Sequence, residues 1–457
     1  MNDVRELAER DRGPDTHIAS ATVPTESPSP AVTPYSWRLL LILVCVYGCS
    51  WMDRYLMIIL IEPIHRELRL SDTQMGLVTG FAFSAVYALA GIPIGYWADR
   101  KSRRVVLSIA ALGWGLATIL SSLVRDFRTL ALARFGLAAF EAGCSPAAYS
   151  LISDSFPASH RGRAIAIYGL GTSIGIWAGL MLGGVISQRY GWRAAFVALG
   201  LPALILSAVV YFFVREPARG DQERTGQGDD TGYSLAGAIR LMLGRHSFLA
   251  ASLALGTLTI TSTSFLSWAP TYLIRFRDLD TAQVGMISGC IVGVSGVLGT
   301  LLIGLLCDRL ARRDPRWYLW LPLIGFGLFL PFERLFFSSS GHWVYVFYFL
   351  TALASATYSA PLFAVGQFVL PPRQRALGAA VMLLVLNMLG MGGGNFAVGF
   401  LSDLFRQQDG DASLQNAILS LQGASVVGFL CLLYAATSIR REMEIDATRG
   451  AATAAVN

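Results

Sequence analysis

Twelve long apolar segments constrain what this chain can fold into more than any other feature of its sequence. They lie near residues 38–61, 75–97, 105–124, 128–152, 164–187, 192–214, 247–274, 282–306, 317–337, 342–369, 376–402 and 414–438. Each is long enough to cross the hydrocarbon core of a bilayer as a helix, which takes about 20 predominantly apolar residues. Because a helix satisfies its backbone hydrogen bonds internally, as lipid requires, the sequence predicts an all-α membrane protein with twelve transmembrane helices.

The low charge content supports this class. Only 14% of the 457 residues are charged, whereas a soluble domain carries about 25%. The net charge is +6, but the basic residues form short clusters between apolar runs and no continuous face that could bind nucleic acid. We therefore expect a monomeric, multi-pass protein of the cell membrane (the inner membrane in a bacterium), with the bilayer as its solvent and no nucleic-acid partner.

One long charged connection divides the chain. Residues 215–245 join the sixth and seventh apolar segments as a cytoplasmic linker, and they separate an N-terminal six-helix half (37–214) from a C-terminal six-helix half (246–439). Residues 1–36 are rich in Pro, Ser and Thr and are expected to form a disordered cytoplasmic tail. Residues 440–457 form a second tail.

The distribution of basic residues predicts the orientation. With the N-terminus in the cytoplasm, the inner loops carry seventeen Lys or Arg residues and the outer loops carry nine. Cytoplasmic loops of membrane proteins are enriched in Lys and Arg. Both termini are therefore predicted to be cytoplasmic.

The two halves also share an internal repeat. Residues 95–104 (GYWADRKSRR) correspond to 304–313 (GLLCDRLARR), and residues 156–164 (FPASHRGRA) correspond to 370–376 (LPPRQRA). The second copies follow the first by 209 residues (308 minus 99) and by 212 residues (373 minus 161). Two landmarks at nearly the same offset indicate that the halves are structural repeats, as in many transporters.

The repeated G-x-x-x-D-R-x-x-R-R pattern resembles the signature loop of the major facilitator superfamily, with Ser102 and Ala311 in place of a family glycine. The resemblance covers the whole hydrophobic body, and it implies the major facilitator fold and transport by alternating access. In the family, the loop locks the cytoplasmic helix ends in one state. The implied cytoplasmic gate residues are Asp99, Arg103, Arg104, Asp308, Arg312 and Arg313. The alternative is that these arginines only anchor the topology.

Four charged residues inside apolar segments are the strongest functional candidates. A charge at the bilayer centre costs about 2.5–3.5 kcal/mol on insertion scales, so it is retained for a purpose. Counted from their helix ends, Asp53 and Arg134 both lie about 8–9 Å from the outer edge of a core about 30 Å thick. We therefore predict that they form a pair, and that this pair is the switch that links protonation of Asp53 to helix movement. The alternative role for this pair is a static salt bridge that only fixes helix register.

Glu141 lies deeper than this pair and shares a helix face with Arg134, seven residues away. No basic partner for Glu141 is evident in the sequence, and Arg54 has no assigned partner either. Desolvation favours the neutral form of a lone carboxyl group. Glu141 is therefore the expected main proton carrier.

Apart from Glu333 and Arg334 near an outer end, the second half carries hydroxyl, amide and aromatic groups in place of buried charges. The possible cavity-lining residues are Thr257, Thr261, Ser264, Trp268, Tyr348, Tyr358 and Asn387. For each hydroxyl taken singly, a hydrogen bond between helices is the better interpretation. A cavity charged on one wall and largely apolar on the other would suit an amphipathic substrate.

Two stretches of the first half are similar to the Spinster family of lipid transporters. One is WMDRYLM with SDTQMGL after it, and the other is RFGLAAFEAGCSPAA. The resemblance carries over to Asp53, Arg54, Arg134 and Glu141, with Phe140 in place of a family glycine, which should narrow the space beside Glu141. It implies export of sphingolipid- or lysolipid-like molecules, and together with Glu141 as the expected proton carrier it leads us to expect a proton-coupled lipid transporter. A proton-coupled organic-anion or drug carrier of the same superfamily is the alternative.

Other function classes find little support in the sequence. There is no H-E-x-x-H motif, no nucleophile elbow at a strand-to-helix turn and no pair of histidines, so neither a lipid-modifying enzyme nor a metal site is indicated. Lys101 precedes Ser102 as in a phosphate-binding loop, but Arg100 stands where that loop requires glycine. The signature loops argue against a receptor or scaffold. We expect no cofactor, and an ion gradient or the substrate's own gradient as the energy source.

Overall fold

The computed structural model describes residues 33–216, 235–371 and 374–454, and within these ranges it is helical with no strand. The first half contains α1 (Pro34–Ile59), α2 (Ile61–Leu68), α3 (Asp72–Gly76), the π-helical turn η1 (Leu77–Phe81), α4 (Ala82–Arg100), α5 (Arg103–Leu120), η2 (Ser121–Leu123), α6 (Phe127–Glu141), α7 (Cys144–Ser155), α8 (Ala158–Tyr190) and α9 (Trp192–Phe213). The second half begins with α10 (Leu235–Gly244), which lies inside the linker expected at 215–245. The N-terminal tail, most of that linker and Arg373 fall outside the described residues.

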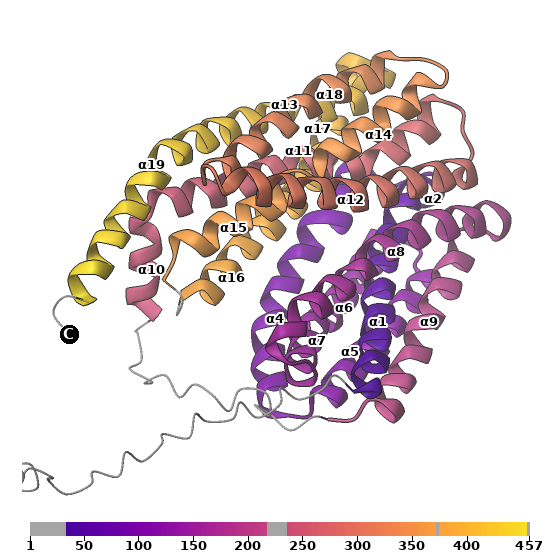
Figure 1. Cartoon of the computed structure of the whole chain (residues 1–457). Helices are drawn as coiled ribbons and strands as arrows, with labels where there is room; N and C mark the ends of the chain where they lie inside the picture. The colour runs from indigo at the N-terminus through magenta and orange to yellow at the C-terminus, as the bar shows by residue number, and fades with distance from the viewer. Residues whose placement is uncertain (1–32, 217–234, 372–373, 455–457) are drawn as a thin grey trace, which may run out of the picture.

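The rest of the second half also consists of long helices interrupted by short breaks. It contains α11 (His246–Phe276), α12 (Thr281–Ala311), α13 (Trp317–Ser338), α14 (Trp343–Ser355), α15 (Ser359–Val369), α16 (Arg375–Val385), the π-helical turn η4 (Leu386–Gly392), α17 (Gly393–Asp409), η5 (Gly410–Ala412), α18 (Ser413–Ser420) and α19 (Gln422–Ala454). Figure 1 shows the two halves side by side.

Ten helical stretches among the described residues are long and apolar enough to span a membrane. The fourth expected segment, which forms α6 and α7, is missing from these ten, and it carries the charged residues Arg134 and Glu141, which lower its mean hydropathy. The eleventh and twelfth expected segments fall within one apolar run, Leu377–Ile439. The all-helical membrane architecture is confirmed, and a count of twelve crossings remains a prediction.

The linker marks one end of the molecule, called here the linker end, and the opposite end is the far end. The hydroxyl of Ser36 at the start of α1 donates to the carbonyl oxygen of Ser155 at 2.9 Å, and Tyr35 bonds to Arg215. In the second half, Ser247 at the start of α11 donates to Ser438 near the end of the described chain at 3.0 Å. The described chain therefore starts and finishes at the linker end.

Close backbone contacts join the halves toward the far end. A Cβ on Gly285 of α12 would lie 3.0 Å from the Cα of Gly184 of α8, and a Cβ on Gly80 of η1 would lie 2.7 Å from the carbonyl oxygen of Gly392. Small residues allow such approaches between helices in lipid. The ribbons diverge toward the linker end (Figure 1). The halves are thus closed at one end only.

A stripe of glycines packs α8 against α1. Gly171, Gly175, Gly179 and Gly183 recur every fourth residue, and a Cβ on Gly171 would lie 2.8 Å from the carbonyl oxygen of Val44. Its contacts with α1 show that this stripe is a packing surface between the two helices. The contact fixes α1, which carries Asp53 and Arg54.

Gly171→Leu should destabilise the protein by about 1–3 kcal/mol, because overpacking forces two helix backbones apart. Gly169→Leu is the matched control, since Gly169 lies on the same helix and a Cβ there would meet nothing within 4 Å. The loss of monodisperse protein on heating in detergent measures both variants. Equal melting temperatures would contradict the tight α1–α8 contact.

Candidate functional site

The four buried charges predicted from the sequence form two ion pairs between α1 and α6. Arg134 Nη1 lies 3.7 Å from Asp53 Oδ2, and both side chains are almost fully buried. The expected Asp53–Arg134 proximity is therefore confirmed. Arg54 Nε donates to Glu141 Oε1 at 2.7 Å. The expectation that Glu141 lacks a basic partner is wrong, because Arg54, the residue after Asp53 on α1, is that partner.

Hydroxyl groups complete each pair. Thr118 of α5 donates to Asp53 Oδ1 at 2.8 Å, and Ser50, one turn before Arg54 on α1, donates to Glu141 Oε1. Adjacent helix residues project about 100° apart, so Asp53 and Arg54 can engage different turns of α6. Each carboxylate thus holds one cation and one hydroxyl donor.

Several polar atoms of this cluster remain without hydrogen bonds to any described residue. They are Asp53 Oδ2, Arg134 Nε and Nη1, and Glu141 Oε2. A buried polar atom without a partner costs about 1–3 kcal/mol. Such atoms can accept a proton, a water or a ligand group, which makes this cluster a candidate binding and proton-transfer site.

Aromatic rings surround Arg54. The guanidinium carbon lies 4.9 Å from the ring centres of Phe83 and Tyr87 and 5.1 Å from that of Trp51. Ring faces attract a cation at such distances. The rings therefore stabilise the charge of Arg54 in addition to its ion pair with Glu141.

A small polar pocket of about 60 Å³ lies between the halves at this cluster. Arg54 and Arg134 line it from the first half, and Thr263, Ser267 and Asn395 line it from the second. The wall formed by the second half carries hydroxyl and amide groups and is therefore less apolar than the sequence predicted. The pocket is too small for a lipid in this state, so a substrate would have to widen it.

Of the predicted cavity-lining residues, Asn387 lines this pocket and the others do not. Thr257 and Ser264 donate to carbonyl oxygens of their own helix, at 2.9 and 2.6 Å, and Thr261 donates to Leu421 at 3.0 Å. Tyr358 donates to Thr259 at 3.0 Å. Trp268 and Tyr348 are fully buried inside the second half. The alternative interpretation, packing and hydrogen bonding within the half, describes these residues better in this state.

Phe140 does not narrow the space beside Glu141 as expected. Its ring lies against Gly113 of α5, where even a Cβ would collide with it. Phe140 is 42% exposed and does not line the polar pocket. The substitution therefore affects the α5–α6 contact and leaves the pocket unchanged.

At the linker end, Arg103 is clamped within the first half. Its Nε donates to Glu216 Oε1 at 2.9 Å, and its Nη1 bonds to Asp154 at the end of α7. Burial alone would raise the pKa of Glu216, but hydrogen bonds from the Arg104 backbone, Ser102 and Arg103 lower it to about 2. The sequence reasoning missed Asp154 and Glu216, although each directly follows an apolar segment.

The other predicted gate residues have fewer polar contacts with described residues than Arg103. Arg104 contributes its backbone N–H to Glu216 at 3.0 Å, and its guanidinium lies over the ring of Tyr211. Asp99 lies in the last turn of α4, and its side chain is outside the described part. Asp308 and Arg312 border a surface pocket at the end of α12, and neither forms an ion pair with any described residue. A gating role for these residues remains a prediction.

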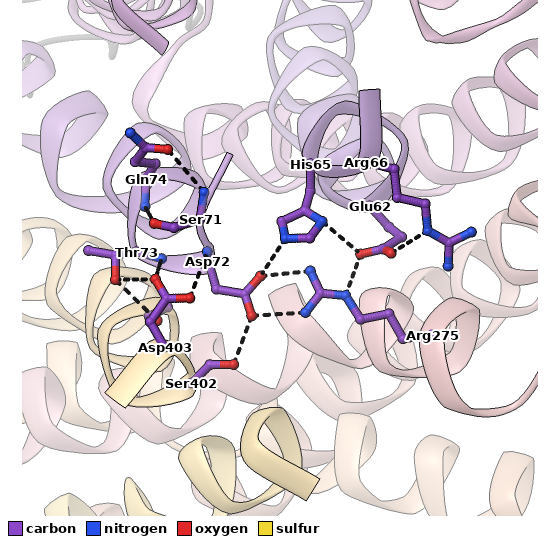
Figure 2. A network of polar contacts seen from close by, with 11 residues as sticks. Glu62, His65, Arg66, Ser71, Asp72, Thr73, Gln74, Arg275, Ser402 and Asp403 are labelled. Carbon is purple, nitrogen blue, oxygen red and sulfur yellow. Dashed lines mark hydrogen bonds and ion pairs between the residues drawn. The ribbon is translucent and has the colours of Figure 1, made fainter. Parts of the chain in front are cut away.

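Sequence reasoning missed a polar network that ties the halves together at the far end (Figure 2). Arg275 of α11 donates to both carboxylate oxygens of Asp72, at 2.8 and 2.6 Å, and also bonds to Glu62 of α2. His65 Nε2 lies 3.7 Å from Asp72 Oδ1. The side chains of Glu62 and Asp72 are almost fully buried. One arginine of the second half therefore bonds to two carboxylates of the first, and Glu62 also accepts a hydrogen bond from Arg66 at 2.6 Å.

A second set of contacts runs from α17 to the start of α3. Asp403 accepts hydrogen bonds from the backbone N–H of Asp72 at 3.2 Å and of Thr73 at 2.8 Å (Figure 2). Ser402 donates to Asp72 Oδ2 at 2.7 Å. The first N–H groups of a helix have no partner within it. Asp403 of one half thus caps a helix of the other.

Arg275→Gln should favour the far-end-open state, because it removes the arginine partner of the buried Asp72 carboxylate and leaves Glu62 with Arg66, and breaking a buried pair costs about 3–5 kcal/mol. Arg277→Gln is the control, since Arg277 donates to Phe337 and Ser339 within its own half. Distances between spin labels placed on α2 and α17 measure the opening. If Arg275→Gln and the control gave the same distribution of label distances, the network would not be what closes this end.

Comparisons with known proteins agree with this geometry. A family model described as Major Facilitator Superfamily matches residues 43–395. An MFS-type efflux pump of Mycolicibacterium smegmatis is 33% identical over 89% of this chain and 94% of its own. The sphingosine-1-phosphate transporter SPNS2 of Danio rerio is 24% identical over 78% of this chain and 74% of its own. A crystal structure of a bacterial homologue of the human lysosomal transporter Spinster, inward-facing and unoccupied, gives a TM-score of 0.81 at 25% identity and covers 90% of this chain and 99% of that chain.

Proposed function

Because the chain belongs to the major facilitator superfamily, whose members are transporters and not enzymes, we propose that it is a proton-coupled secondary transporter that moves amphipathic lipids by alternating access. The lipids would be sphingolipid- or lysolipid-like. The observation that carries the proposal is the pair of ion pairs, Asp53–Arg134 and Arg54–Glu141, at the pocket between the two halves. The resemblance to Spinster transporters seen in the sequence is confirmed by these relatives.

The arrangement of the two ends supports alternating access. The far end is closed by the Arg275 network, and the halves diverge at the linker end (Figure 1). With twelve crossings and both termini in the cytoplasm, the linker end would face the cytoplasm and this state would be inward-facing. That is the state of the Spinster homologue to which the chain is similar. We place the protein in the cell membrane as a monomer.

Protonation of Glu141 would loosen the α1–α6 contact. A neutral carboxyl no longer holds Arg54 by charge, and Ser50 can turn to another acceptor. Arg54 would keep its aromatic neighbours and gain freedom toward the pocket. Proton binding at Glu141 is thereby linked to a cation that can meet a negatively charged headgroup.

The Asp53–Arg134 pair would act as the coupling switch. Its atoms are 3.7 Å apart, which is an ion pair without a hydrogen bond, and two nitrogens of Arg134 make no hydrogen bond to a described residue. Protonation of Asp53 would free Arg134 to bind an anionic headgroup or to approach Glu141. A ligand or proton that prefers one arrangement shifts the population toward it, which is what coupling requires.

A lipid substrate is supported by the name of one relative, a sphingosine-1-phosphate transporter. The alternative, a proton-coupled organic-anion or drug carrier, is supported by the relative named as an efflux pump. The two alternatives can be distinguished by proton flux into liposomes. The flux is measured with compounds that share a charged head and differ in their tail. A flux that depends on head charge and ignores the tail would favour the alternative.

Glu141→Gln should abolish proton-driven accumulation while substrate binding stays within about threefold, because Gln mimics the protonated carboxyl in shape and charge. Glu333→Gln is the control, since Glu333 is an equally buried carboxyl of the second half that accepts a hydrogen bond from Gln422 at 2.7 Å. Accumulation in proteoliposomes under a pH gradient measures both. Normal accumulation by Glu141→Gln would remove Glu141 as the proton carrier.

Asp53→Asn and Arg134→Ala should each uncouple the pH dependence of the conformational change, since losing one charge leaves the other uncompensated. The double variant should cost little more than either single variant, because the interaction is already lost. The pH response of label distances across the linker end measures all three. Strictly additive effects would mean that the two residues act separately, and the switch would be refuted.

A further inference from the structure

A second pocket, about ten times larger than the polar one, lies between the halves nearer the linker end. Its volume is about 610 Å³, against about 60 Å³ for the polar pocket. Its walls come from α4 of the first half and from α11, α16 and η4 of the second. It shares no lining residue with the polar pocket. Ligand pockets measure about 300–1,000 Å³, so this pocket has the size of a small-molecule site.

The two pockets adjoin along the same two helices. Ser84 lines the polar pocket, and Ala85 and Ala88, the next residue and the next turn of α4, line the large one. On η4, Asn387 lines the polar pocket and Met388 the large one. The helices cross just beyond, where a Cβ on Gly392 would lie 3.1 Å from the Cβ of Ser84. The large pocket therefore begins where the polar pocket ends.

The lining of the large pocket offers no side-chain donor or acceptor that is free for a ligand. Its only polar side chain is that of Ser252, and this hydroxyl donates to the carbonyl oxygen of Phe248 at 2.7 Å. All other lining residues are alanine, valine, leucine, methionine or phenylalanine. A polar group placed there would lose its hydrogen bonds to water without replacement. The occupant must be an alkyl chain or a similarly apolar group.

We propose that this pocket holds the alkyl chain of a single-chain amphiphile and sets the preferred chain length, while the headgroup reaches the polar pocket. This inference rests on the proposed lipid substrate and adds where the tail lies. One apolar pocket beside one charged pocket matches a molecule with one tail and one head. Arg134, with two nitrogens free of hydrogen bonds to described residues, suits an anionic or zwitterionic headgroup. The small side chains of Ala85 and Ala88 leave the room that the tail occupies.

The test measures equilibrium binding of radiolabelled alkylphosphocholines of increasing chain length to the protein in nanodiscs, without a proton gradient. Each methylene that enters the pocket should tighten binding about fourfold, which corresponds to about 0.8 kcal/mol. Free amphiphile also partitions into the nanodisc lipid. The ratio between variant and wild type cancels this partition, because the lipid is the same for both.

Ala88→Trp should fill the pocket and weaken binding of the longest chains by about tenfold or more, with the shortest chains within about twofold of wild type. Met388→Ala should act in the opposite direction and move the tightest binding to longer chains. Leu305→Trp is the control, because Leu305 lies on α12, is 70% exposed, and does not line either pocket. The opposite shifts of two variants cannot both arise from misfolding.

The outcomes separate this inference from the proposed function. Opposite shifts of chain-length preference in Ala88→Trp and Met388→Ala support the tail pocket. If the wild type binds and neither variant changes its chain-length profile, the large pocket does not hold the tail, and the proposed lipid substrate still stands. No binding of any chain length to the wild type would overturn both. Equal competition by a two-chain phospholipid would mean that bilayer lipid fills the pocket, and the inference would fail.

Discussion

The high cost of an unpaired charge in hydrocarbon organises the first half of this protein. Two acids and two arginines at membrane depth can be tolerated only as pairs. Their pairing requires α1 and α6 to lie in contact at a defined height, which the glycine contact between α8 and α1 helps to fix. The pairs are incomplete, since each carboxylate and Arg134 retain atoms without hydrogen bonds to described residues. The same constraint that holds the helices together therefore leaves sites where a proton or a headgroup can bind.

The second half complements this cluster with neutral groups. Thr263, Ser267 and Asn395 face the polar pocket, while most of its other hydroxyls bond within the half. Charge changes are thus confined to one wall, and the opposite wall can slide or tilt without breaking an ion pair. An apolar pocket directly beside this wall provides a separate environment for a tail. The division between a charged region and an apolar region follows the division of an amphipathic molecule.

Sequence reasoning found the helical membrane architecture and the height of Asp53 and Arg134, because rise per residue is constant along a helix. It could not find the Arg54–Glu141 pair, because pairing also depends on how each helix is rotated about its axis, which spacing within one helix does not reveal. The hydroxyls of α11 illustrate the same difficulty, since their abundance does not tell which of them face the pocket. Arg275 directly follows the seventh apolar segment, where the sequence shows only an outer-loop charge, although the residue joins the halves. Its role depends on contacts between segments about 200 residues apart, 275 minus 72 being 203.

The far-end network has a consequence for how readily that end can open. The contact between the halves at the far end is called here the seam. Asp403 caps backbone N–H groups of α3, and Arg275 binds Asp72, so nearly every hydrogen bond and ion pair of this network joins groups that water also solvates well. A net hydrogen bond within a protein contributes only about 0.5–1.5 kcal/mol, because water takes its place when it breaks. When the seam opens, acid and base become hydrated together, and neither charge is left buried alone. An apolar seam of equal area would resist wetting. A polar contact like this one can hydrate and re-form at little net free energy, so in the proposed cycle the direction of movement is set by the gradients on the two sides of the membrane.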